Sequence, residues 1–403
     1  MFFVEEKNLN KIPLLYKKLV IIVFLALLTI PILDWKIKFI PRTVLHGLQN
    51  STARPQYSWK AFKDGHFQRA IEEYALKNHG VWGWSVRGFN EIILALFSQI
   101  TTDYKISFQY GNEGHFWQPM YLRAFNRYDE PNSKKIGEKL EFYHRLKNRL
   151  KKYNIQFHGL ISPNKLEMYP ELIPDKYKNP LREDKKRGYD LAKNIIHKKD
   201  ISIFDGYQTL LDYKSKNNFN LRFFETTGSH WNQIGSCVVT RSILSNIYPS
   251  TYELPCEDYS FETTREEDLD LLKVSNLLFP DQKIGTSPYI KYRGQPSSSK
   301  KLKVLLVGTS FLFGIQEQLM ISGVADETLL YFYYKSQRNT LDTNFKPINK
   351  KDISIEEILS YDLILVEGNM SNVSSLSYGF MRDLEKKLIK YEKSKKVALP
   401  VSK

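Results

Sequence analysis

The sequence predicts an α/β domain in which a doubly wound parallel sheet is flanked by helices, preceded by one N-terminal transmembrane helix. Three short apolar runs bounded by polar residues are typical of buried parallel strands, and they cover residues 155–161, 304–307 and 363–366. Helical stretches fall between these runs, at residues 185–197, 235–247 and 354–360. This alternation of strand and helix favours the doubly wound arrangement, whose ligands bind at the carboxyl ends of the strands.

The transmembrane helix is predicted from the apolar run at residues 19–33, which follows Lys17 and Lys18. The run alone spans about 22 Å as a helix, and residues 14–16 with snorkelling lysines extend it toward the ~30 Å of a bilayer core. No small-residue cleavage site follows the run, so an uncleaved anchor is preferred over a signal peptide. A buried core helix is the remaining alternative.

The positions of the lysines favour a cytoplasmic N-terminus at residues 1–18, with the anchor at 19–35. A tether at residues 36–58 would follow. The expected location is therefore the inner membrane, crossed once, with the main domain in the periplasm.

Composition excludes several classes of protein. The chain has 403 residues, with 59 Lys and Arg against 44 Asp and Glu, a formal charge of +15. The charges are intermixed and no zinc-finger spacing or long basic block occurs, so a solvated surface is expected and no nucleic-acid partner. The two cysteines, Cys237 and Cys256, are too few for a four-thiolate zinc site, and no structural metal is expected. Whether they pair is left open.

The main domain is expected at residues 59–390, followed by a basic tail at 391–403. Residues 59–100 have helical spacing with a break at the Gly-Val-Trp-Gly-Trp stretch of residues 80–84. Residues 133–150 predict an amphipathic helix that leads into the first strand.

Two local patterns could carry nucleophilic chemistry. Ser310 follows the strand at 304–307 through Gly308 and Thr309, at the carboxyl edge of the sheet. A serine there can use its own backbone N–H and the dipole of the next helix to stabilise an oxyanion; helix capping is the alternative role. His230 lies in a Gly-Ser-His-Trp-Asn turn before a helix, where it could act as a base or cap the helix.

The two patterns together resemble the SGNH-hydrolase-like domain of the AlgJ/AlgX-like alginate O-acetyltransferase family. Residues 228–232 precede residues 308–311 by about eighty positions, in the permuted order of that family. Residues 110–116 and 161–171 also resemble family segments, so the resemblance covers roughly residues 59–390. It implies Ser310 as the acyl-accepting nucleophile and His230 as the base.

The chain departs from the family pattern in two places. Gly228 stands where the family has the aspartate of its catalytic triad, and Thr309 replaces the aspartate before the serine. Glu225, Asp205 or a backbone carbonyl could orient the imidazole instead.

Further site residues are expected from their positions. Asn369 and Asn164 follow strands and could donate to an oxyanion, or only form turns. Trp231, Lys165 and Arg87 could contact a glycan, or pack and fix loops.

The expected function is a membrane-anchored extracytoplasmic O-acetyltransferase. It would modify hydroxyls of an exported polysaccharide through an acyl-serine intermediate, without a cofactor. The resemblance implies alginate biosynthesis and a multi-pass membrane O-acyltransferase that supplies the acetyl donor. The alternatives are a carbohydrate esterase of the same fold and a non-catalytic glycan-binding subunit of an export complex, the latter motivated by Gly228.

Overall fold

The computed structural model describes residues 14–397 except 49–51, 103–105, 179–181, 183–184, 218, 292–299, 341 and 343. The start of the expected cytoplasmic segment, residues 1–13, and the end of the basic tail, residues 398–403, lie outside the described residues. The chain forms two compact units: Met1–Ser107 with Leu272–Gln282, and Phe108–Leu271 with Lys283–Lys403. We call them unit 1 and unit 2 and describe each by itself.

Unit 1 begins with helix α1, Leu14–Ile37, which is long and apolar enough to cross a membrane. Its 24 residues extend about 36 Å, and most of its apolar side chains are exposed. Asp34 near its end is buried, and its carboxylate accepts hydrogen bonds from the backbone N–H groups of Ile40 and Gly80. The same side chain therefore ties the end of α1 to the start of a later helix.

That later helix is α4, Gly80–Phe97, which follows α2, Trp59–Lys63, and α3, His66–Lys77, and precedes strand β1, Gln99–Thr102. The expected break at residues 80–84 is displaced. The helices are interrupted at residues 78–79, and α4 already starts at Gly80, where His79 accepts a hydrogen bond from Trp82.

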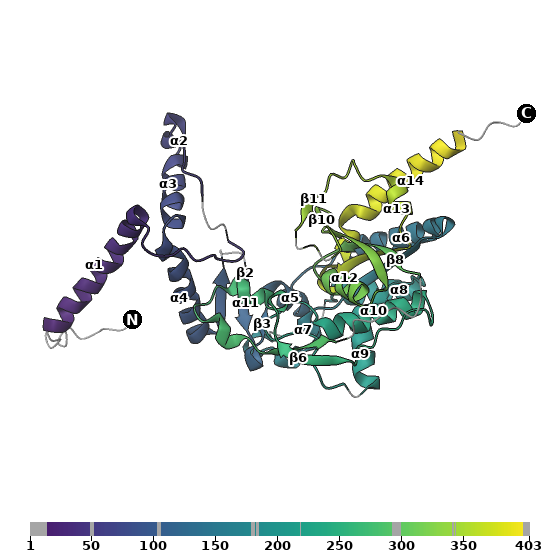
Figure 1. The fold of residues 1–403 in the computed structure, drawn as a ribbon, viewed down its shortest axis with the longest axis horizontal. Coiled ribbons are helices and arrows are strands. Elements are labelled where there is room, and N and C mark those ends of the chain that lie inside the picture. The colour runs from purple at the N-terminus through teal and green to yellow at the C-terminus, as the bar shows by residue number, and fades with distance from the viewer. Residues whose placement is uncertain are drawn as a thin grey trace, which may run out of the picture. The chain divides into compact units, whose positions relative to one another are not determined.

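Unit 2 is built on a seven-stranded sheet in the order β11-β10-β9-β8-β12-β4-β5. Figure 1 labels its strands β8, β10 and β11. The strands are β4, Gln156–Ser162; β5, Phe204–Asp205; β8, Leu302–Gly308; β9, Ala325–Phe332; β10, Ser336–Asn339; β11, Lys346–Pro347; and β12, Leu363–Asn369. The five strands from β9 to β5 are parallel, which confirms the predicted sheet. The edge strands β10 and β11 are antiparallel and make the sheet mixed.

Helices cover both faces of the parallel strands because successive side chains of a strand point to opposite faces. In β8, Val304 and Leu306 pack with one cluster of buried side chains, and Leu305 and Val307 pack with the other. The first cluster includes α9, Gly206–Lys216; α10, Gln233–Ile247; and α12, Leu312–Ile321. The second includes α6, Ser133–Leu150; α8, Gly188–Lys198; α13, Ile355–Leu359; and α14, Phe380–Val397.

The remaining elements of the chain are short. They are β2, Ile106–Tyr110; β3, Phe116–Trp117; α5, Pro119–Phe125; α7, Lys165–Met168; β6, Tyr259–Thr263; α11, Asp270–Ser275; and β7, Thr286–Ile290, besides several 3-10 turns. β3 pairs with β2, and β6 pairs with β7, both antiparallel.

The two cysteines form a disulfide, a pairing that the sequence had left open. Cys237 on α10 is bonded to Cys256, 19 residues later, and both are buried. The bond joins α10, which begins directly after the His-Trp-Asn turn, to the segment that leads into β6.

We expect removal of this disulfide to lower the free energy of unfolding by about 3 kcal/mol, because a loop of this length is then no longer closed in the unfolded chain. Chemical denaturation of the full chain in detergent, with and without a thiol reductant, measures the change. The variant Cys237→Ala/Cys256→Ala should unfold at one denaturant concentration under both conditions. Equal unfolding of the wild-type chain with and without the reductant would contradict the expectation.

Candidate active site

Ser310 lies where the sequence places it, in the turn between β8 and α12. Gly308 ends β8, and a Cβ atom there would lie only 2.7 Å from the Cβ of Glu367. Glu367, on the neighbouring strand β12, accepts a hydrogen bond from the backbone N–H of Thr309 at 2.7 Å. Ser162, at the end of β4, donates its hydroxyl to the same carboxyl. The turn before Ser310 is therefore fixed by the ends of two adjacent strands.

Glu367 is fully buried, and burial raises the pKa of its carboxyl. Within the described part of the chain, the backbone N–H of Ser310 donates to no acceptor. This N–H lies just before the first turn of α12. It is the kind of donor that can stabilise a negative oxygen beside the serine.

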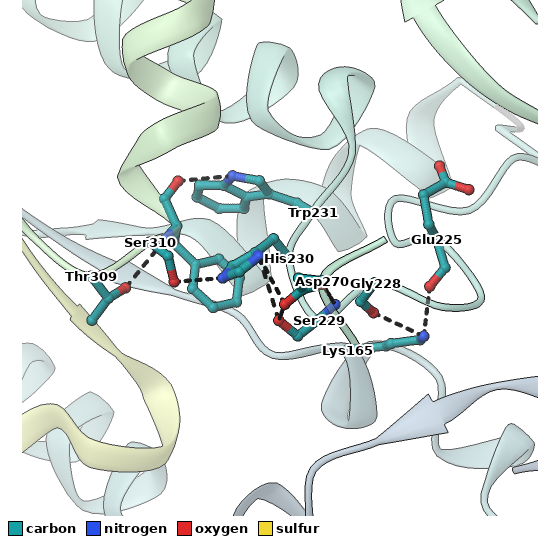
Figure 2. A network of polar contacts seen from close by, with 10 residues as sticks. Lys165, Glu225, Gly228, Ser229, His230, Trp231, Asp270, Thr309 and Ser310 are labelled. Atoms are coloured by element: carbon teal, nitrogen blue, oxygen red, sulfur yellow. Dashed lines mark hydrogen bonds and ion pairs between the residues drawn. The ribbon is translucent and has the colours of Figure 1, made fainter. Parts of the chain in front are cut away.

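His230 reaches Ser310 from the other side of the site. Its Nε2 lies 2.5 Å from Oγ of Ser310, and its ring packs edge-on against Phe311 (Figure 2). The next residue, Trp231, donates its indole N–H to the backbone carbonyl of Phe311 at 3.0 Å. The side chain of Asn232 then caps α10 by accepting from Gly235. The turn that carries the imidazole is thus bonded to the turn that carries the hydroxyl.

The other ring nitrogen of His230 faces a carboxylate that the sequence did not indicate. Oδ2 of Asp270, the first residue of α11, lies 3.4 Å from Nδ1. Ser229 donates its backbone N–H to Oδ1 of Asp270 at 2.8 Å and its hydroxyl to Oδ2. Asp270 is forty residues beyond the histidine in a segment without a recognisable motif, so no local pattern singled it out.

The two carboxylates expected at the imidazole lie elsewhere. Glu225 accepts a hydrogen bond from the side chain of Asn232 at 2.9 Å, and burial raises its pKa. Asp205 caps α9 by accepting from Gln208 and also accepts from the hydroxyl of Tyr189. The structure therefore assigns both to other contacts.

The two asparagines expected in an oxyanion hole are placed in turns. The side chain of Asn369 accepts from Ser371 and donates to the carbonyl of Pro163. Asn164 caps α7 by accepting from Glu167, and its buried Nδ2 meets no hydrogen-bond partner among the described residues. Their observed bonds match the alternative role in turn formation.

Lys165 is buried rather than presented to a ligand. Its ammonium donates to the backbone carbonyls of Glu225, Thr226 and Gly228, at 2.5, 2.6 and 3.0 Å, and to that of Phe116 at 3.3 Å. Burial lowers its pKa to about 7. Three of these carbonyls belong to the loop that leads into His230, and Figure 2 shows the bonds to Glu225 and Gly228. Lys165 thus holds this loop, and the expected contact with a glycan is replaced by a structural one.

The other two expected glycan contacts also have structural partners. Trp231 is 3% exposed and packs against Phe311, although it borders the cavity described below. Arg87 lies in unit 1, where it donates to the hydroxyl of Thr43 and to the carbonyls of Val44 and Leu277. It fixes a loop there.

A cavity of about 340 Å³ opens beside Ser310 and His230. Its wall includes Phe313, whose ring is covered by the guanidinium of Arg338 at 4.4 Å. Asp268 also lines the cavity and accepts a hydrogen bond from the hydroxyl of Tyr289, and burial raises its pKa to about 7. The cavity therefore combines an apolar wall with polar groups next to the serine. Among the described residues, no cluster of His, Cys, Asp or Glu is arranged to hold a metal.

We expect Lys165→Met to lower the free energy of unfolding by about 1–3 kcal/mol, because buried carbonyls lose their donor. The reactivity of Ser310 should fall as well, since the loop before His230 is no longer held. Denaturation and labelling of Ser310 by an acyl ester measure the two effects. Lys193→Met, at an exposed position, is the matched control, and equal behaviour of the two variants would contradict the assigned role of Lys165.

Stability should fall as the pH rises from about 4 to about 7, in part through Asp268. Its carboxyl stays protonated in the folded protein up to about pH 7, whereas in the unfolded chain it ionises near its ordinary pKa of 3.8. The unfolded state thus binds fewer protons in this window, which favours unfolding as the pH rises. Asp268→Asn should flatten the dependence in denaturation measured at several pH values. Asp258→Asn, at an exposed position, should leave it unchanged, and an unaltered slope in Asp268→Asn would contradict this role.

The comparison with protein families agrees with the geometry of the site. Residues 120–318, which include Ser310, His230 and Asp270, match the family model of the SGNH hydrolase-like domain of acetyltransferase AlgX. No curated protein matches the chain significantly in sequence.

Solved structures with a similar fold are distant. The O-acetyltransferase domain of Pseudomonas putida AlgJ is 13% identical with a TM-score of 0.40, over 70% of this chain and 99% of that chain. Bacillus cereus PatB1 with a sulfonyl adduct gives the same four values. Pseudomonas aeruginosa AlgX is 12% identical with a TM-score of 0.37, over 68% of this chain and 67% of that chain. These likenesses are too distant to carry an assignment. The family model gives the more specific likeness: residues 120–318 match the SGNH hydrolase-like domain of the AlgX acetyltransferase type.

Proposed function

We propose that the protein is a membrane-anchored extracytoplasmic O-acetyltransferase that modifies hydroxyls of an exported polysaccharide. The observation that carries the proposal is the contact of 2.5 Å between Nε2 of His230 and Oγ of Ser310, at the edge of a cavity. Both residues lie in the segment that matches the acetyltransferase family. A hydroxyl in contact with an imidazole is the arrangement that activates serine as a nucleophile.

The reaction has two halves with the same residues. In the first, His230 takes the proton of Ser310 while Oγ attacks the carbonyl carbon of the acetyl donor, and the histidine then returns the proton to the leaving group. In the second, His230 takes the proton of a sugar hydroxyl, whose oxygen attacks the acetyl-serine. The acetyl ester of the sugar leaves, and the proton returns to Ser310.

The negative oxygen formed in each half needs a donor close to the serine. The backbone N–H of Ser310 and the positive end of the dipole of α12 support this role, since neither requires a rearrangement of the chain. The cavity wall of Phe313 and Arg338 offers a surface for the acyl donor or the sugar acceptor.

The placement outside the cytoplasm is supported by two features. Helix α1 has the length and composition of a membrane anchor, and disulfides such as Cys237–Cys256 persist in oxidising compartments. We place α1 in the inner membrane and the catalytic unit in the periplasm. The acetyl group would then reach the enzyme from a multi-pass membrane O-acyltransferase, and alginate is the polymer that the family resemblance implies.

The geometry removes the main reason for proposing a non-catalytic glycan-binding subunit. It was suggested by Gly228, which removes the carboxylate of the family pattern, yet a carboxylate does lie at the imidazole of His230. An esterase would use the same Ser310 and His230, with water in place of the sugar hydroxyl. Acceptor assays with oligosaccharides separate the two, because only a transferase yields acetylated sugar.

We expect the full chain to gain one acetyl group on Ser310 from p-nitrophenyl acetate, observed by intact mass and peptide mapping. Ser310→Ala removes the acceptor atom, and His230→Ala should lower the rate of acylation by about 10²–10⁴-fold, the usual contribution of a positioned base. Ser245→Ala and His197→Ala, both at exposed positions, are the matched controls. A folded wild-type chain that acylates no faster than Ser310→Ala would overturn the proposal.

A further inference from the structure

We propose that Asp270 is the positioning residue of His230, and that it replaces from the start of α11 the carboxylate that the chain lacks at position 228. This inference rests on the proposed function of Ser310 and His230. It names the group that keeps the imidazole in the form that can act as a base.

The space for a side chain at residue 228 is filled by the segment that carries the new carboxylate. A Cβ atom on Gly228 would lie 2.5 Å from the backbone oxygen of Asp268, closer than real Cβ contacts. Asp268 lies two residues before Asp270. One packing arrangement therefore leaves no room for a side chain at position 228 and places Asp270 beside the imidazole ring of His230.

The carboxylate is held in place by the residue next to the histidine. Ser229 donates two hydrogen bonds, one from its backbone N–H to Oδ1 of Asp270 and one from its hydroxyl to Oδ2. Ser229 itself is 3% exposed, whereas the side chain of Asp270 is 31% exposed, so these bonds are partly buried. They leave Oδ2 of Asp270 3.4 Å from Nδ1 of His230.

Nδ1 of His230 faces two oxygens at 3.4 Å, Oδ2 of Asp270 and the hydroxyl oxygen of Ser229, whose own hydrogen is donated to Asp270. A carboxylate only accepts hydrogen bonds, so the arrangement favours the proton on Nδ1 of His230, facing Asp270. Nε2 then presents its lone pair to the hydroxyl of Ser310, which is the state required of a base. An asparagine at position 270 could instead donate its amide N–H to Nδ1 and favour the opposite tautomer.

Two other carboxylates that line the cavity have different contacts. Asp268 accepts from Tyr289, and Glu317 accepts from the side chain of Gln233 at 2.5 Å. Of the described carboxylates, Asp270 is the one that lies within 4 Å of a nitrogen of His230. It is therefore the residue to change.

The experiment compares Asp270→Asn with Asp205→Asn in the full chain in detergent. Asp205 was the competing carboxylate from the sequence, and asparagine preserves its role as a helix cap. We expect Asp270→Asn to lower kcat for acylation of Ser310 by p-nitrophenyl acetate by about 10²–10⁴-fold, the upper value being that seen when asparagine replaces the acid of a Ser-His-Asp triad. KM should change little, and Asp205→Asn should react like the wild type. Asp270→Glu, which keeps a carboxylate, should recover part of the rate.

A second measurement follows the tautomer directly. NMR of the full chain labelled with ¹⁵N-histidine, with His230→Gln to assign the signal, should show the proton on Nδ1 in the wild type and a shift toward Nε2 in Asp270→Asn. A purely structural role of Asp270 would leave the tautomer unchanged. This measurement also applies if Asp270→Asn loses activity through partial unfolding, because Asp270→Glu, which keeps a carboxylate, should leave the proton on Nδ1.

Each result decides between outcomes. Wild-type rates in Asp270→Asn, or loss of activity in Asp205→Asn instead, would overturn the inference while leaving the proposed function intact. A wild-type chain that is not acylated at all would overturn the proposed function, and the tautomer of His230 would still decide the role of Asp270. We also expect Gly228→Asp to restore no activity to Asp270→Asn, since its side chain would meet the backbone of Asp268.

Discussion

The site depends on the buried ammonium of Lys165. A charged group without water is costly unless it is bonded on several sides, and here backbone carbonyls of the loop before His230 and the carbonyl of Phe116 provide those bonds. The lysine needs the carbonyls of the loop to offset the cost of burying its charge, and the loop needs the ammonium as a hydrogen-bond donor. Lys165 begins the short helix after β4, so its bonds fix the position of the loop relative to the sheet that also carries Ser310. The imidazole of His230 and the hydroxyl of Ser310 are thereby fixed in position relative to one another.

Local patterns allowed a large part of the architecture to be predicted. The runs at 155–161, 304–307 and 363–366 correspond to the adjacent parallel strands β4, β8 and β12. The last two runs are apolar throughout, as is typical of buried parallel strands, whereas the first also contains Gln156 and His158. The edge strands β10 and β11 were missed, since they are short and polar and are defined only by their pairing. Ser310 and His230 were predicted because their two turns, each of which alone could be a helix cap, together resemble a family pattern.

The remaining site residues depend on contacts that a single sequence does not reveal. Asp270 faces His230 only because the chain folds back over forty residues, and nothing around it resembles a catalytic turn. Lys165 was expected either to contact a glycan or to fix a loop, and only the folded chain, in which four backbone carbonyls surround its ammonium, decides for the loop. Glu367 was missed for the same reason as Asp270, since its bonds to Thr309 and Ser162 come from neighbouring strands that are far apart in sequence.

The close approach of Asp268 to Gly228 has a consequence for how such a site can change over time. Aspartate at position 228 would require the segment at 268–270 to move, because its Cβ would lie 2.5 Å from the backbone oxygen of Asp268, and Asp270 belongs to the same segment. A side chain at position 228 and the present backbone at Asp268 exclude one another sterically. Under the proposed role of Asp270, introducing aspartate at position 228 alone, or removing the carboxylate at position 270 alone, would leave the imidazole without a well-placed carboxylate. Only a combined change of both segments would restore the family pattern.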